Sequence, residues 1–258
     1  MAFVIIPELR LVQVVKKKII AIAGLLLAAV AIVGLLFSQT AHKPHVEEIP
    51  LSEEEIESII TLYIIDDSDE EITMVADTPP KPVSYPPVNI TRVGFGTDGK
   101  YLYIKIEVLG EIPTKKDDPV TKITYCILMD TDENGTSGWC GYDACVGLYI
   151  TWTPLGDYSV DTTLTYNIPT IDDEEQAFDL ADRTTCEYKG GPGKNYVVLR
   201  VPMDLLGLKS GQKVVMDVHA EAESSEYHHY SFDALRSEQY NYHGLGNYFW
   251  HSIQITIP

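Results

Sequence analysis

The run of residues 130–138 carries the side chains of this chain best suited to binding chemistry. It reads Asp-Thr-Asp-Glu-Asn-Gly-Thr-Ser-Gly, so Asp130, Asp132 and Asn134 offer side-chain oxygens at alternate positions. Gly135 then permits the sharp turn that would fold these oxygens around one point. Hard oxygen ligands on such a loop suit a calcium ion, which we expect as a structural cofactor. An acidic hairpin turn without a metal is the alternative.

The remaining calcium ligands have to come from outside this short run. A complete EF-hand loop carries Glu at its twelfth position, where this chain has Gly141, and no helical pattern flanks the loop. Residues 123–129 alternate as a strand, which places the loop at a strand end. We therefore predict that Thr136, through a nearby carbonyl, and Asp143 complete the site.

The N-terminal region predicts a membrane anchor. Ile19–Phe37 contains no charge, and about 20 such residues span a bilayer as a helix. Because Arg10 and Lys16–Lys18 precede it, residues 1–18 should stay in the cytoplasm and the C-terminal part should be extracellular. A cleaved signal peptide and a pilin-type leader are alternatives. Gln39-Thr40-Ala41 is a poor cleavage motif, and no Gly or Ala follows the lysines at the usual pilin processing point.

The exported part is strongly acidic. Residues 1–41 carry a net charge of +3 and the whole chain −19, which leaves −22 on the remainder. Such a surface repels phosphate and excludes nucleic acid as a partner, whereas it suits cations, neutral sugars or solubility outside a cell. Asn89-Ile-Thr is a glycosylation acceptor by pattern. Asn134-Gly-Thr matches too, but we favour the ligand role there.

Four cysteines in an exported domain predict disulfides. We expect Cys140 to pair with Cys145 across a short loop, and Cys126 to pair with Cys186 between two strands. A zinc site is disfavoured because the spacing contains no Cys-x-x-Cys pair.

Period-2 alternation dominates the elements that must position these residues. Leu102, Ile104 and Ile106 share one expected strand face, and turn residues recur at short intervals. This pattern predicts an all-β fold, an antiparallel β-sandwich of immunoglobulin or jelly-roll type over residues 62–258. Residues 38–61 should form a stalk with a short helix within Leu51–Thr61. The expected strands cover residues 62–65, 100–108, 123–129, 148–153, 158–166, 184–188, 196–201, 214–220 and 253–257.

The chain contains one nucleotide-binding look-alike and no enzyme signature. Gly94–Gly99 matches G-x-G-x-x-G, but a strand follows it instead of a helix, so we interpret it as a hairpin turn. The sequence contains no His-Glu-x-x-His and no G-x-S-x-G motif. We predict that the protein is not an enzyme.

Three segments share a pattern with a known group of β-sandwich domains: Thr97–Ile106, Ile127–Gly135 with Gly141–Asp143, and Tyr196–Leu208. They resemble family 9 carbohydrate-binding modules and the related DOMON-like sandwiches. The resemblance extends from about Leu62 to the C-terminus and implies a sandwich fold. Relatives of this kind bind sugars, bind calcium structurally, or bind haem in electron-transfer proteins. The paired tryptophan sugar clamp of the family cannot be placed on this chain.

Aromatic and histidine side chains supply the candidate ligand-binding residues. Aromatic rings can stack on sugar rings, and His228 with His229 could instead bind a transition metal. Packing between sheets is the alternative for these aromatics. The candidates are Trp139, Trp152, Tyr227, His228, His229, Tyr230 and Trp250.

Together these features predict a membrane-anchored extracellular binding module, stabilised by calcium and recognising glycans or cell-surface polymers. The first alternative is a structural cell-surface protein that self-assembles into a filament or surface layer. The second is a noncovalent haem-binding electron-transfer sandwich, which needs Met and His ligands that face one pocket.

Overall fold

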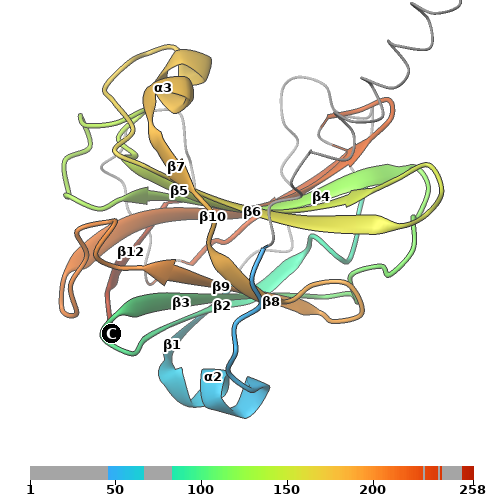
Figure 1. The fold of residues 1–258 in the computed structure, drawn as a ribbon, viewed down its shortest axis with the longest axis horizontal. Coiled ribbons are helices and arrows are strands. Elements are labelled where there is room, and N and C mark those ends of the chain that lie inside the picture. Colours follow the sequence, from blue (N-terminus) through green and yellow to red (C-terminus); the bar gives the residue numbers. More distant parts are fainter. Residues whose placement is uncertain (1–45, 67–82, 229, 238, 240–251) are drawn as a thin grey trace, which may run out of the picture. The chain divides into compact units, whose positions relative to one another are not determined.

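Two antiparallel sheets lie face to face in the computed structural model, which describes residues 46–66, 83–228, 230–237, 239 and 252–258 (Figure 1). The five-stranded sheet has the order β1-β2-β3-β9-β8. Its strands are β1 (Ile60–Ile65), β2 (Ile90–Thr97), β3 (Tyr101–Val108), β8 (Glu187–Gly190) and β9 (Tyr196–Pro202). The predicted all-β, antiparallel architecture is confirmed.

The seven-stranded sheet has the order β11-β10-β4-β5-β6-β7, and β12 pairs with β10. Its strands are β4 (Val120–Asp130), β5 (Ala144–Trp152), β6 (Tyr158–Tyr166), β7 (Asp182–Thr184), β10 (Lys213–Ser224), β11 (Ser231–Ala234) and β12 (Ile253–Thr256). The long strands β4, β5 and β10 are neighbours, and the acidic loop connects β4 to β5 at the end of this sheet.

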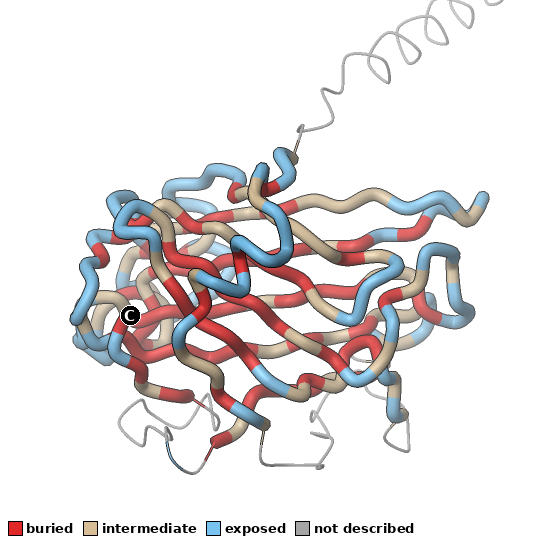
Figure 2. The backbone as a smooth tube through the Cα atoms, turned by 90° about the horizontal axis from the view of Figure 1, so that it is seen from below, coloured by how far each residue is buried: buried red, intermediate tan, exposed pale blue. Residues whose placement is uncertain are grey.

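The main core fills the space between the sheets, where the buried segments of Figure 2 face each other. Successive side chains of a strand point to opposite faces, so every second residue of β3 and β4 faces inward. Ile104 and Ile106 on β3, and Ile127 and Met129 on β4, are fully buried there. The alternation seen in the sequence thus correctly identifies the core face of these strands.

The segment before β1 packs on the outer face of the five-stranded sheet. The helix α2 (Glu53–Ile59) begins at Ser52, whose hydroxyl accepts from Glu55 N while the Glu55 carboxylate accepts from Ser52 N. Ile49 N donates to the Tyr188 carbonyl over 2.8 Å, and Ile56 is 2 % exposed. The compact unit therefore starts at Val46, whereas the sequence analysis places a stalk up to residue 61.

The predicted membrane span at residues 19–37 lies outside the described residues. Among the helices that are described, none has the length and apolar character needed to cross a bilayer.

A second helix, α3 (Glu174–Leu180), was not expected from the sequence. It begins at Asp173, whose carboxylate accepts from Gln176 N over 2.8 Å. Ala177 and Phe178 pack against a smaller apolar cluster on the outer face of the seven-stranded sheet, which also contains Leu128 and Tyr142. Figure 1 shows α3 above this sheet, on the side opposite the main core.

The predicted disulfides are not present, and all four cysteines are free. Cys126 contacts the outer cluster around α3, whereas Cys186 lies in the core between the sheets, so these two side chains face opposite sides of the sheet. Cys140 lies in the β4–β5 connection with φ +52°, and Cys145 approaches Cys126 instead, with 3.5 Å between the Sγ atoms. Both predicted pairings, Cys126–Cys186 and Cys140–Cys145, are therefore wrong in this structure.

Candidate metal centre

The acidic loop connects β4 to β5, and strand pairing brings its two ends together. Asp130 is the last residue of β4 and Asp143 directly precedes β5. Met129 pairs with Ala144, and Asp143 N donates to the Met129 carbonyl over 3.0 Å. As a result, carboxylate oxygens of Asp130, Asp132 and Asp143 all lie within 4.8 Å of one another.

Hydrogen bonds from the loop backbone hold all three of these carboxylates. Asn134 N donates to Asp130 Oδ1 over 3.1 Å and to Asp132 Oδ1 over 2.9 Å. Such bonds from an Asp side chain to backbone two or four residues on are typical of tight turns. On the other side, Thr131 N donates to Asp143 Oδ1 over 3.1 Å. The carboxylate positions are therefore fixed by the loop itself.

Asp130 is the most constrained member of the cluster. Its side chain is fully buried, and among the described residues its Oδ2 has no hydrogen-bond partner. Burial, followed by the hydrogen bond shared with the Asp132 carboxyl, raises the pKa of Asp130 to about 6. Burial also raises the pKa of Asp143, against the hydrogen bonds from Thr131. The two charges that act on Asp130 belong to Asp132 and Asp143, both of them carboxylates.

The two non-acidic predicted ligands contact each other. The Thr136 hydroxyl donates to Asn134 Oδ1 over 2.7 Å, and both residues are exposed. The predicted ligands thus present carboxylate, amide and hydroxyl oxygens, and among the described residues no Cys or His belongs to the cluster. That donor set suits calcium better than a transition metal.

A second cluster combines Glu221 and Glu223 of β10 with His228. Here the structure already supplies a cation, because Lys122 Nζ lies 2.5 Å from Glu223 Oε1. His228 Nδ1 is 3.5 Å from Glu223 Oε2, and the ring is half exposed. His229, the other predicted transition-metal ligand, lies outside the described residues.

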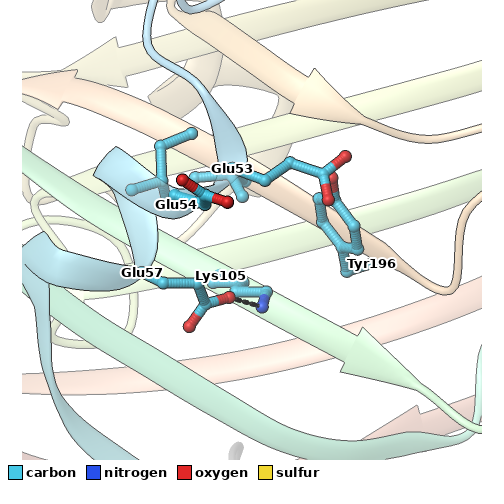
Figure 3. Close-up of a pocket in the computed structure, with 7 residues that line it drawn as sticks. Glu53, Glu54, Glu57, Lys105 and Tyr196 are labelled. Carbon is cyan, nitrogen blue, oxygen red and sulfur yellow. Dashed lines mark hydrogen bonds and ion pairs between the residues drawn. The ribbon is translucent and has the colours of Figure 1, made fainter.

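A pocket of about 430 Å³ lies between α2 and the outer face of the five-stranded sheet (Figure 3). The Glu53 carboxylate lies beside the Tyr196 ring, and the Lys105 ammonium lies 5.0 Å from the centre of that ring. The sequence analysis missed this site because its residues are far apart in the chain. The lining residues are Glu53, Glu54, Ile56, Glu57, Lys105, Tyr196 and Val198.

Ion pairs occupy the floor of this pocket. Lys105 is paired with both Glu57 and Glu107, and its side chain is only 9 % exposed. Burial opposes ionisation of Glu57, but the hydrogen bonds from Lys105 and Tyr63 prevail and lower its pKa. Glu54 also lines this pocket.

The tryptophans predicted to bind ligand serve in packing where the structure describes them. Trp152 is 5 % exposed in the main core. Trp139 meets Phe178 of α3 edge-on, with 5.7 Å between the ring centres. Trp250 is outside the described residues.

The other predicted site residues are dispersed. Tyr227 lies in the turn after β10, and Tyr230 packs against the main core. Asn89 is half-buried directly before β2. Met216 faces the main core, whereas the neighbouring His219 projects from the opposite face of β10, so this Met–His pair does not share the pocket that haem ligation would need.

Comparison of the chain with protein-family models gives no match, and comparison with curated proteins gives none either.

Proposed function

We propose that this domain is a calcium-stabilised, extracellular β-sandwich that serves as a binding module. The observation that carries the calcium proposal is the buried Asp130 carboxylate, which faces two further carboxylates. Burying a carboxylate is costly unless a charge or a metal compensates it. A divalent cation would compensate all three groups at once.

The acidic loop fits this cation in type and arrangement. Asp130, Asp132 and Asp143 would supply the charged ligands, and the loop backbone already orients all three of them. Calcium accepts six to eight oxygen ligands in flexible geometry, so carbonyl oxygens and water would complete the shell. Such an ion would fasten the end of β4 to the start of β5, which is a structural role.

Calcium titration of the full-length protein tests this proposal. Binding to the native state alone stabilises by RT ln(1 + [L]/Kd), about 2.7 kcal/mol at a hundredfold excess over Kd. We expect calcium to raise the melting temperature, a chelator to reverse the rise, and Asp130→Asn with Asp132→Asn to abolish the response. Glu221→Gln, in the second acidic cluster, is the matched control and should respond like the wild type. A melting curve that calcium leaves unmoved would refute the proposal.

For the binding partner we propose a neutral glycan, held in the pocket beneath α2. The carboxylates of Glu53 and Glu54 can accept hydrogen bonds from sugar hydroxyls, and Tyr196 offers an aromatic surface with a polar tip. The net charge of −22 after residue 41 disfavours anionic polymers. This assignment replaces Trp139 and Trp152 of the sequence prediction, both of which pack against apolar side chains.

A panel of neutral oligosaccharides, incubated with the full-length protein, tests the glycan assignment. Tyr196→Ala and Glu54→Gln should weaken binding at least tenfold, whereas Tyr227→Ala, which lies outside the pocket, should leave it unchanged. Loss of binding in Tyr227→Ala with retention in Tyr196→Ala would move the site elsewhere. Absence of binding to every member of the panel would contradict the assignment, without affecting the calcium proposal.

A further inference from the structure

Two cysteines meet on the outer face of the seven-stranded sheet. In the β4–β5 ladder, Cys126 pairs with Gly147 and Leu128 pairs with Cys145. Residues two apart on a strand share a face, so the two cysteines are diagonal neighbours on that face. Their Sγ atoms are 3.5 Å apart, although the residues are separated by 19 positions in the chain.

The surroundings of these thiols favour reaction between them. Gly147 leaves no side chain opposite Cys126, and the Tyr149 hydroxyl lies over that gap, 2.5 Å from where a Cβ would stand. His219 on β10 stands directly opposite Cys126. A thiolate is the reactive form of cysteine.

We propose that Cys126 and Cys145 are an oxidisable pair that forms a disulfide between β4 and β5. This bond would close the hairpin at the base of the acidic loop, since residues 130–143 lie between the two cysteines. This disulfide requires neither calcium nor a glycan. It also differs from both pairings predicted from the sequence.

The oxidant is a disulfide, either a small molecule such as oxidised glutathione or a protein disulfide. One cysteine thiolate attacks the donor, whose S–S bond breaks as a mixed disulfide forms and the first donor thiolate leaves. The second cysteine then loses its proton and attacks the mixed disulfide, which releases the second donor thiolate. The two cysteine protons pass to the two released thiolates. The oxidising disulfide is thereby reduced to two thiols and gains the two electrons that the cysteines lose.

The other two cysteines provide internal controls. Cys186 is buried in the core on the opposite side of the sheet, where burial raises the pKa of its thiol to about 12. Cys140 lies in the β4–β5 connection, where burial and then the charges of Glu174 and Asp172 raise its pKa. Neither should react with the donor while the protein is folded.

Thiol mapping of the folded full-length protein tests the pair. The protein is incubated with oxidised glutathione or with a phosphine reductant, then denatured, alkylated, digested and examined by mass spectrometry. The oxidised sample should lose two of its four alkylatable thiols and yield one cross-linked peptide pair that contains Cys126 and Cys145. It should also melt several degrees above the reduced sample.

Variants separate this outcome from other linkages. Cys140→Ser should form the same cross-link as the wild type, while Cys126→Ser and Cys145→Ser should form none and should melt alike with and without oxidant. Four free thiols after oxidation of the folded protein, a Cys140–Cys145 linkage, or a persistent glutathione adduct on Cys126 or Cys145 would overturn the proposal. The wild-type peptide map decides the matter even if a variant fails to fold.

Discussion

The protein treats buried carboxylates in two opposite ways. Under α2, the pKa of the largely buried Glu107 is lowered despite its burial because Arg92 and Lys105 pair with it. The pKa of the half-exposed Glu57 is lowered by hydrogen bonds from Lys105 and Tyr63. In the acidic loop, the pKa values of Asp130 and Asp143 are raised, with burial as the leading cause. The fold thus supplies its own cation at one site and only acidic neighbours at the other.

The difference follows from where each group lies. Lys105 projects from the middle of β3, with Glu107 next on the same face, and α2 lays Glu57 over both. Asp130 and Asp143 instead flank a turn at the strand ends. A basic side chain on a sheet face is a fixed counter-ion for a neighbouring carboxylate. A loop lined with oxygen atoms instead suits a cation that binds from solution. The following changes test this contrast, in order of expected effect.

Removing the built-in cation should have the largest effect. In Lys105→Met the side chain keeps its length but loses its charge, which leaves Glu107 buried without this partner. Because Arg92 still pairs with Glu107, we expect a cost at the low end for breaking a buried pair, about 3 kcal/mol, which should show as a lower free energy of unfolding in urea. Lys194→Met is the control, because its pair with Glu53 is half exposed and should contribute less than about 1 kcal/mol. Equal losses in the free energy of unfolding of both variants would mean that the buried ion pair contributes no more than the half-exposed one.

Neutralising the acidic loop should act in the opposite direction. Without calcium, the raised pKa of Asp130 means that its charged form destabilises the fold, and the lost stability grows as pH rises from about 4 to about 6. Asp130→Asn should therefore raise the free energy of unfolding by up to about 3 kcal/mol at pH 8 in chelator, because the pKa is raised by about two units at about 1.4 kcal/mol each. Denaturation with excess calcium should show the reverse order. A destabilised Asp130→Asn protein in chelator would mean that the loop needs the charge without any ion.

Asp233 provides an intermediate case, because its carboxylate accepts hydrogen bonds from two backbone N–H groups. Asp233 Oδ2 accepts from Ile90 N over 2.6 Å and so connects β11 to β2 across the two sheets. Burial, opposed by this hydrogen bond, raises its pKa to about 7. The folded state therefore holds the proton more tightly, and stability from this group is lost as pH rises through 7.

We expect this group to lower the free energy of unfolding by about 1 kcal/mol between pH 6 and pH 7. The measurement compares wild type with Asp233→Asn, since other acids titrate in both proteins and cancel. If the two proteins show the same change over this interval, the carboxylate is ionised throughout.

The strands and the acidic loop could be predicted because their signals are local. The predicted bounds of Tyr158–Tyr166 coincide with β6, and the inward face of β3 follows from alternation alone. Asp143 was predicted to join Asp130 and Asp132, and strand pairing does bring the three carboxylates together.

The features that sequence analysis missed depend on register and on distant contacts. Cys126 meets Cys145 only because the ladder pairs Cys126 with Gly147 and Leu128 with Cys145. A shift in that register would separate them. Lys105 and Glu57 are 48 positions apart, and nothing in either local pattern links them. The helix α3 is short, and its packing on the outer cluster, rather than a long apolar period, accounts for it.

The segment that precedes β1 has a mechanical consequence. Glu47 and Ile49 form two main-chain hydrogen bonds with Tyr188 at the edge of the five-stranded sheet, and Ile49 and Ile56 are inserted beneath them. Tension applied to the chain at residue 46 must break these bonds and extract both isoleucines before any load reaches β1. When force is applied on the N-terminal side, the segment before β1 therefore detaches first. The β-sandwich remains folded during this step.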